Sequence, residues 1–230
     1  MPGRPAREPL RAVLFDLDGT LTPPRSSWQY LHERLGLWAG EAERIQERFR
    51  AGEISYEDFC RLDAEAWRGL PAARLRALCD EIPYHPGAAG LMASLRRRGV
   101  RTGIVSTGLT FLSDRVWREL AMDHAVANEI VEKAGVITGE VVIHVPHGGK
   151  DRALARFCGA FGLTPGSVAA VGDSPGDLSM FRAAGLAVAF NATDAAVERG
   201  ADAVVPGEDL GALVNCLLTD GGNACRDAST

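Results

Sequence analysis

The chain has 230 residues, of which 46% are hydrophobic and 24% are charged, a balance typical of a globular protein. Its formal net charge of −5 argues against a nucleic-acid partner, because phosphate backbones are bound by basic faces. The five cysteines are widely spaced and form no CxxC pair, so we expect a cytoplasmic protein without a disulfide framework. Residues 1–9 lack the apolar core of a secretory signal, and no apolar stretch reaches the length of about 18 residues that a membrane helix needs.

The first apolar run, at residues 12–15, leads into two aspartates, Asp16 and Asp18, and then into Gly19. Side chains two residues apart on a strand point the same way, so both carboxylates are expected on one side. Two like charges held together need a cation or a shared proton, and Mg²⁺ prefers hard oxygen ligands. The run therefore indicates a magnesium site where a carboxylate attacks phosphorus, although a plain acidic turn before a glycine would have the same sequence.

The next segment, residues 22–84, contains no strand-like run. It carries amphipathic stretches instead, such as Trp28, Leu31 and Leu35 at helical spacing, and Ser55 with Asp58 resembles a helix start. This pattern predicts a small helical insert directly after the first strand. We therefore expect an α/β core at residues 10–21 and 85–218, a helical cap at 22–84, and flexible termini at 1–9 and 219–230.

The remainder of the chain alternates between short apolar runs and amphipathic helices. Strands are expected at residues 101–105, 168–171, 186–190 and 203–205, helices at 87–98 and 151–161, and a β-hairpin within 128–142. Strands that alternate with helices predict a doubly wound parallel sheet covered on both faces. Ligands of such sheets bind beyond the carboxyl ends of the strands, which is where Asp16, Ser106 and Asp173 fall.

Three further segments carry side chains suited to phosphate or metal binding. Residues 106–108 are Ser-Thr-Gly, whose hydroxyl and backbone N–H groups can hold a phosphoryl oxygen. Lys150 is one of two lysines in the chain, and residues 172–177 form an acidic turn that contains Asp173 and Asp177. Taken singly, these segments also fit a plain turn, a surface charge and a helix cap.

In the order of these motifs the chain resembles the haloacid dehalogenase superfamily of phosphatases, and within it the phosphoserine phosphatase-like branch. Residues 16–20 match its DxDGT motif, 22–84 its small cap, 128–141 its hairpin and 171–187 its last motif. The resemblance implies a Rossmannoid core with a small helical cap inserted after the first strand. It also implies an Mg²⁺-dependent phosphatase that hydrolyses a small phosphorylated metabolite, as a monomer or homodimer without membrane or nucleic-acid partners.

The same resemblance assigns roles to individual residues. Asp16 is the nucleophile that forms an aspartyl-phosphate, Asp18 is the general acid and base, and Lys150 pairs with the nucleophile and the phosphate. The implied magnesium ligands and supporting groups are acidic: Asp16, Asp18 through its carbonyl, Asp173 and Asp177. The implied phosphate-binding or substrate-binding residues are Ser106, Thr107, Gly108 and Arg25.

The chain departs from phosphoserine phosphatases at the substrate-reading positions. Arg25 stands where an acidic residue is expected, the expected cap arginine falls near Asp63, and Gly176 replaces an asparagine. These departures count against phosphoserine but not against phosphatase chemistry. The candidate substrate readers are Arg25, Trp28, His32 and Arg61, although Trp28 also fits core packing and His32 a surface position.

Two other functions remain open at this level. A phosphotransferase or phosphomutase would use the same scaffold and pass the phosphoryl group to a second alcohol. A catalytically silent binding module would keep the fold without turnover. Dehalogenation is disfavoured, because a halide leaving group needs neither Asp18 nor a metal.

Overall fold

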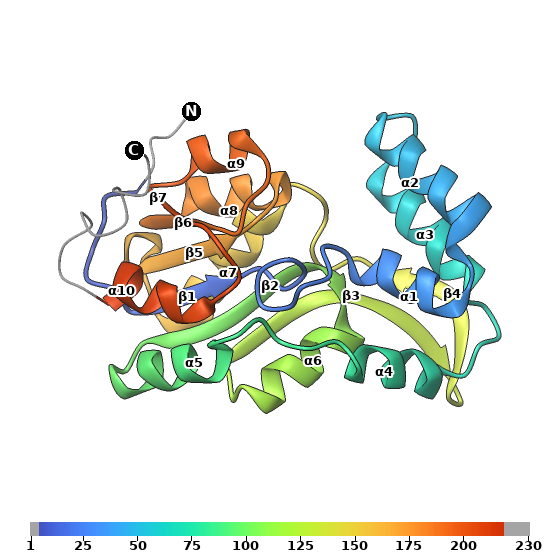
Figure 1. Cartoon of the computed structure of the whole chain (residues 1–230), viewed down its shortest axis with the longest axis horizontal. Coiled ribbons are helices and arrows are strands. Elements are labelled where there is room, and N and C mark those ends of the chain that lie inside the picture. The colour runs from blue at the N-terminus through green and yellow to red at the C-terminus, as the bar shows by residue number, and fades with distance from the viewer. Residues whose placement is uncertain (1–4, 219–230) are drawn as a thin grey trace.

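The computed structural model describes residues 5–218, so most of the predicted flexible termini lie outside the described residues. Within this part, seven strands form one sheet in the order β4-β3-β2-β1-β5-β6-β7 (Figure 1). The strands are β1 (Ala12–Phe15), β2 (Arg101–Leu109), β3 (His124–Lys133), β4 (Val136–Val142), β5 (Val168–Gly172), β6 (Leu186–Phe190) and β7 (Ala203–Val205). All neighbours run parallel except β3 and β4. The predicted α/β fold with a mainly parallel sheet is confirmed.

All four side chains of β1 are apolar, as expected for a strand covered on both faces. The strand lies at the centre of the sheet, where these side chains are buried. Alternate residues face opposite layers: Val13 and Phe15 belong to one core cluster, Ala12 and Leu14 to the other. Phe15 pairs with Ile104 of β2 and Val171 of β5. Asp16 therefore leaves the sheet beside the carboxyl end of β5, while β2 continues past it to Leu109.

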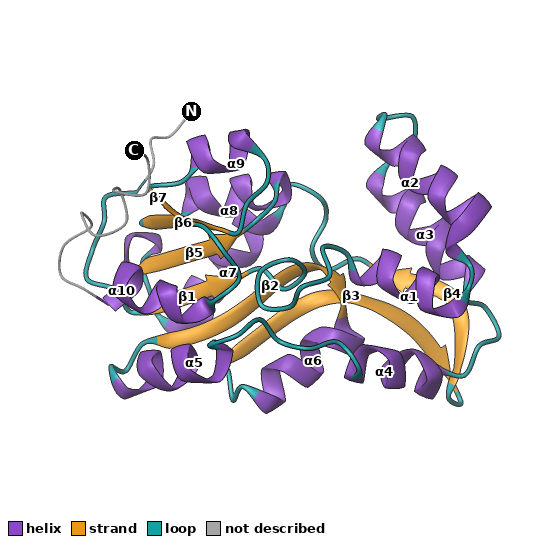
Figure 2. Cartoon of the chain, in the orientation of Figure 1, coloured by secondary structure: helices purple, strands orange, loops and turns teal. Residues whose placement is uncertain are grey.

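Helices cover both faces of the sheet (Figure 2). The face of Val13 is packed by α5 (Ala88–Arg97), α6 (Thr110–Glu119) and α10 (Leu213–Leu218), and the other by α7 (Lys150–Phe161), α8 (Leu178–Ala183) and α9 (Ala195–Gly200). Short 3-10 helices lie at Pro165–Ser167, Pro175–Asp177 and Leu210–Ala212. The helices predicted at 87–98 and 151–161 are confirmed within one residue at each end.

Strands β2 and β3 are longer than predicted. β2 continues to Leu109 with a register irregularity after Val105, and β3 begins at His124 and pairs in parallel with β2 before it enters the hairpin with β4. The prediction that the strand stops at residue 105 was wrong, because the Ser-Thr-Gly segment is not a turn but an irregular part of the strand.

The segment between β1 and α5 is helical. It contains α1 (Ser27–Leu35), a kinked turn (Trp38–Ala42), α2 (Glu43–Arg50), α3 (Tyr56–Ala66) and α4 (Ala72–Asp80). Ser55 caps α3 by accepting a bond from the Asp58 N–H, as its sequence signal predicts. In Figure 1, α2 stands away from the central strands, α3 packs beside β4 at the end of the sheet, and α4 lies near α6. The assignment of residues 22–84 as a separate cap stays a prediction.

No helix in the described part of the chain combines the length and the apolar character required to cross a membrane.

Candidate active site

Lys150 lies between two carboxylates at the edge of the sheet. Its Nζ is 2.7 Å from Asp16 Oδ1 and 2.6 Å from Asp177 Oδ1, and all three side chains are buried. Burial by itself lowers the pKa of Lys150, but attraction to Asp16 and Asp177 outweighs this effect and raises it. The ammonium therefore stays charged. The fold places Lys150 in contact with Asp16 of the first motif, as the resemblance implies.

The carboxylates at this edge outnumber the lysine. Oxygens of Asp16, Asp173 and Asp177 lie within 4.8 Å of one another. Burial, followed by repulsion from Asp177, raises the pKa of Asp16 well above its usual value and that of Asp173 to about 7. A cation bound among these oxygens would favour their ionised forms and remove this penalty. The donor set, three buried carboxylates, fits Mg²⁺.

The turn after Asp16 is shaped to admit Asp173. Gly19 has a φ of +83°, and a Cβ at this position would overlap with the Asp173 carboxylate. The hydroxyl of Thr20 donates a hydrogen bond to Asp173 Oδ1 at 2.9 Å. The Gly-Thr pair of the first motif therefore positions an acid that lies more than 150 residues later in the chain.

Asp177 serves both as a helix cap and as part of the cluster. Its Oδ2 accepts bonds from the N–H groups of Asp173 and Ser174, at 3.1 and 3.0 Å. Its Oδ1 accepts the bond from Lys150. Asp177 is therefore both a helix cap, which was the alternative interpretation of this turn, and a member of the acidic cluster.

Asp18 is held by the start of helix α1. Its Oδ2 accepts bonds from the Ser27 N–H at 3.0 Å and the Ser27 hydroxyl at 2.8 Å. Its Oδ1 is buried and has no hydrogen-bond partner among residues 5–218. Burial raises the pKa of Asp18 above its usual value. One carboxyl oxygen is therefore anchored and the other is available for proton transfer.

Ser106, Thr107 and Gly108 lie beside Asp18. The Gly108 N–H donates to Ser106 Oγ at 2.9 Å, and Ser106 is buried. A Cβ on Gly108 would overlap with Asp18 Oδ2 and the Ser27 hydroxyl. Only a glycine allows this close approach of β2 to the first motif.

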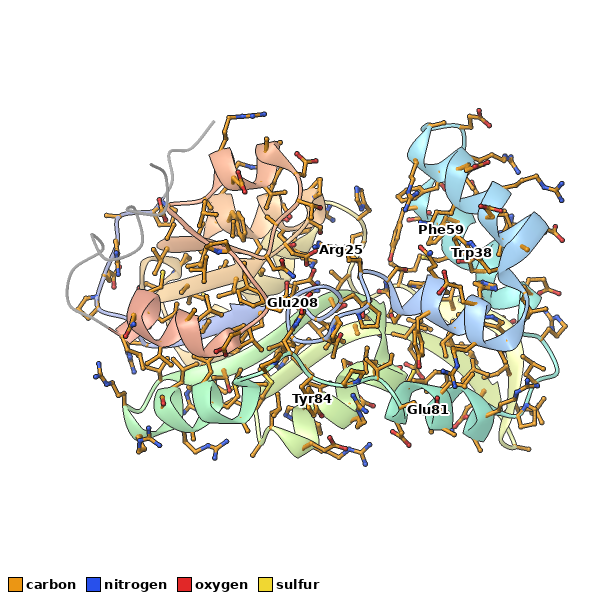
Figure 3. The ribbon with its side chains drawn as sticks, viewed as in Figure 1. Arg25, Trp38, Phe59, Glu81, Tyr84 and Glu208 are labelled. Atoms are coloured by element: carbon orange, nitrogen blue, oxygen red, sulfur yellow. The ribbon has the colours of Figure 1, made fainter. Side chains whose placement is uncertain are left out.

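Arg25 reaches the acidic cluster from the loop before α1. Its Nη1 is 2.6 Å from Asp173 Oδ2, and its Nη2 donates to the carbonyl of Asn191 at 3.0 Å. Figure 3 shows Arg25 between the core strands and helices α1–α3 in this view. Arg25 was predicted to bind phosphate or substrate, and here its guanidinium contacts Asp173, a predicted metal ligand. The Arg25 side chain remains 44% exposed.

Two of the cap candidates take other positions than expected. The surface position expected for His32 was wrong: it is buried, its ring packs on Trp67, and its Nε2 lies 3.3 Å from Asp63 Oδ1. Arg61 is exposed and pairs with Asp58 on the same helix. The sequence prediction failed for His32 because its partner lies on a different helix.

Trp28 is buried, as its core-like spacing predicts, and stacks on Trp67 with ring centroids 5.5 Å apart. Its Nε1 also donates to the carbonyl of Thr107. Sequence reasoning missed Ser27 and Asn128. Ser27 follows the N-cap of α1, a recognisable signal, whereas nothing in the local pattern marks Asn128.

Comparison with known proteins gives consistent matches. The sequence model for haloacid dehalogenase-like hydrolases matches residues 13–182. The chain is 34% identical over 186 residues to "Phosphoserine phosphatase SerB2" of Mycobacterium tuberculosis, covering 80% of this chain and 45% of that protein. It is 37% identical over 183 residues to a phosphoserine phosphatase of Halobacterium salinarum, covering 76% of this chain and 83% of the relative.

A solved structure described as a "Phospho-Aspartyl Intermediate Analogue of Phosphoserine phosphatase" superposes with a TM-score of 0.79 at 26% identity, covering 90% of this chain and 99% of the other. Among the curated relatives, the chain spans only 45% of the Mycobacterium tuberculosis and Streptomyces coelicolor proteins and 60% of an Archaeoglobus fulgidus one. The resemblance predicted from the motifs is confirmed.

Proposed function

The chain belongs to the haloacid dehalogenase-like hydrolase family, and from this we propose that it is an Mg²⁺-dependent phosphatase that hydrolyses a small phosphomonoester through an aspartyl-phosphate. The observation that carries the proposal is the buried contact of 2.7 Å between Lys150 and Asp16, which is one of a cluster of three carboxylates with Asp173 and Asp177. The curated relatives named phosphoserine phosphatases support the same reaction class.

Asp16 would attack the phosphorus atom as a carboxylate and form the aspartyl-phosphate. Lys150 would favour the ionised form of Asp16 and attract the phosphoryl oxygens. Ser106 and the N–H of Thr107 would donate hydrogen bonds to these oxygens. Together these groups stabilise charge on the transferring phosphoryl group, which is the main demand of this chemistry.

Asp18 would carry the proton of both steps. Its burial raises its pKa and so favours the protonated form that the first step needs. From Oδ1 the proton would pass to the departing alkoxide, which leaves as an alcohol. The resulting carboxylate would then accept a proton from the water that hydrolyses the aspartyl-phosphate, while Ser27 keeps Oδ2 in place.

The residues that would hold Mg²⁺ are Asp16, Asp173 and the carbonyl of Asp18, with Asp177 supporting them. When bound there, Mg²⁺ would neutralise charge on the phosphoryl oxygens and orient the group. Arg25, on Asp173, would approach the phosphoryl group or another anionic part of the substrate from the same side.

The cap contacts count against phosphoserine as the substrate, although several relatives carry that name. Asp63 lies near the position expected for a carboxylate-binding arginine, and it pairs with His32. Arg61 pairs with Asp58 on the surface. We therefore propose a small phosphorylated metabolite whose alcohol portion is bound by other contacts.

The first experiment measures phosphate release from para-nitrophenyl phosphate and from phosphorylated amino acids, sugars, glycerols and polar head groups, with Mg²⁺ or with a chelator. Release that requires Mg²⁺ is expected. Transfer to an added alcohol would reveal a phosphotransferase, and no release from any substrate would favour the binding-module alternative and refute the proposal.

A second experiment tests the intermediate. Nitrophenolate leaves without a proton, so Asp18→Asn should still form the aspartyl-phosphate but hydrolyse it slowly. Rapid quenching and peptide mass spectrometry should find the phosphoryl group on Asp16. A phosphoryl group on any other residue would contradict the assignment of the nucleophile.

A further inference from the structure

The carbonyl of Thr107 accepts three hydrogen bonds from distant parts of the chain. The donors are Trp28 Nε1 at 3.2 Å, the Tyr56 hydroxyl at 2.8 Å and Asn128 Nδ2 at 3.0 Å. Trp28 lies on α1 and Tyr56 on α3, both within the segment inserted between β1 and α5, whereas Asn128 lies on β3. One backbone oxygen next to the phosphate-binding serine thus joins three elements.

The other end of the same peptide unit points to Ser106. The peptide between Thr107 and Gly108 is planar, so fixing its carbonyl also fixes its N–H. That N–H donates to Ser106 Oγ at 2.9 Å. A serine oxygen that accepts a hydrogen bond keeps its own proton free to donate elsewhere. The three donors therefore orient the peptide that orients the Ser106 hydroxyl.

The position of the Tyr56 hydroxyl is itself fixed. It accepts a bond from Asn128 Nδ2 at 2.9 Å while it donates to the Thr107 carbonyl at 2.8 Å. The ring packs against Phe49 and Phe59, with centroids 5.7 and 6.1 Å away.

Asn128 is anchored in turn. Its Oδ1 accepts bonds from the N–H groups of His144 and Val145, both at 2.9 Å, and its side chain is buried. Its Nδ2 also donates to the Val145 carbonyl at 3.2 Å, so two amide protons are shared among three acceptors. The chain of hydrogen bonds is continuous from β3 to Ser106, and hydrogen bonds in such a buried chain strengthen one another.

We propose that Tyr56 is a positioning residue, which with Trp28 and Asn128 holds the Thr107–Gly108 peptide so that the Ser106 hydroxyl presents its proton to a phosphoryl oxygen. This inference rests on the proposed phosphatase function. It links the placement of α1 and α3 to phosphate binding, because two of the three donors leave the carbonyl if these helices move away.

The first test is Tyr56→Phe, which keeps the packed ring and removes the hydroxyl. With para-nitrophenyl phosphate and Mg²⁺ we expect kcat to fall about ten-fold and KM to change less than about two-fold, since a misdirected donor costs less than a deleted one. The matched control is Tyr84→Phe, which removes a hydroxyl bound to Glu119 away from this network. Thermal unfolding shows whether both variants are folded.

The decisive test is a double-mutant cycle with Ser106→Ala. If Tyr56 acts through Ser106, Tyr56→Phe should change kcat less than about two-fold once the serine hydroxyl is absent. An equal loss in both backgrounds would show a general structural role and overturn the inference. Trp28→Phe, which removes another donor to the same carbonyl, should repeat the pattern and gives an independent result if Tyr56→Phe is unstable.

The outcomes separate this inference from the proposed function. Wild-type protein that releases no phosphate would refute the proposed function and this inference with it. Active wild-type protein with a normal kcat in Tyr56→Phe and Trp28→Phe would overturn the inference alone.

Discussion

Two regions of the molecule bury an acid against a base, and they differ in charge balance. At the sheet edge, Lys150 contacts Asp16 and Asp177, with Asp173 nearby as a further acid. Among the inserted helices, His32 faces Asp63 alone. Burial raises the pKa of the acid in both regions, so burial alone does not distinguish them.

The excess of carboxylates distinguishes the two regions. The carboxylates of Asp16, Asp173 and Asp177 outnumber the two cations that contact them, Lys150 and Arg25, and leave negative charge that a bound cation would compensate. A single acid beside a single base leaves no such excess. We therefore interpret the edge cluster as a reaction site and the His32–Asp63 pair as a link between α1 and α3. The following predictions test this distinction.

The largest expected effect is on turnover at the edge. Asp16→Asn should lower kcat at least about 1,000-fold, as the loss of a covalent nucleophile does elsewhere. The fold should persist, because the substitution removes one charge from a site with excess acids. Phosphate release and circular dichroism check both parts. Retention of more than a few per cent of activity would contradict the role of Asp16.

Lys150→Met should affect both activity and stability. We expect kcat to fall about 100-fold to 1,000-fold, as for removal of one charge-stabilising donor. The free energy of unfolding should fall by about 3–5 kcal/mol, because Asp16 and Asp177 lose their buried partner. Urea unfolding measures the loss. Lys133→Met, the other lysine, lies exposed in the β3–β4 hairpin and is the matched control.

Mg²⁺ should stabilise the edge cluster. At a concentration 100 times its Kd, the ion should raise the free energy of unfolding by about 2.7 kcal/mol. Asp173→Asn should abolish this increase, while Glu132→Gln, an exposed acid paired with Arg76, should leave it intact. Calorimetry with and without a chelator makes the comparison. Equal stabilisation in all variants would place the ion elsewhere.

The smallest effect is expected in the helices. At pH 7, Asp63→Asn should change the free energy of unfolding by no more than about 1 kcal/mol, because the amide removes a desolvated charge and still offers His32 a partner. Its kcat should stay close to that of the wild type. A large loss of kcat would show that the pair belongs to the reaction site.

The buried Asp63 should make the free energy of unfolding depend on pH in a predictable direction. Burial raises the pKa of Asp63 above its unfolded value, so folding favours the protonated form. The stability contributed by this shift is complete below about pH 4 and is lost as the pH rises through the folded pKa. Asp63→Asn should remove this part of the pH profile, as measured by urea unfolding across the range.

Local patterns in the sequence were sufficient for the elements that form the centre of the fold. The apolar run of β1 predicts a buried strand because both of its faces are covered, and helices α5 and α7 follow from the spacing of their apolar residues. The motif residues Asp16, Ser106 and Asp173 could be assigned to one edge because parallel strands bring their carboxyl ends together. Lys150, which begins α7, was assigned to the same site by the family resemblance.

The tertiary structure alone decided the contacts between distant segments. His32 on α1 faces Asp63 on α3. The hydrogen bonds from Tyr56 and Asn128 to the Thr107 carbonyl join α3, β3 and β2. Neighbours in the chain determine periodicity, capping and strand character, and these are legible in the sequence. The partner of a polar side chain is set by packing between elements, and no local pattern records that partner.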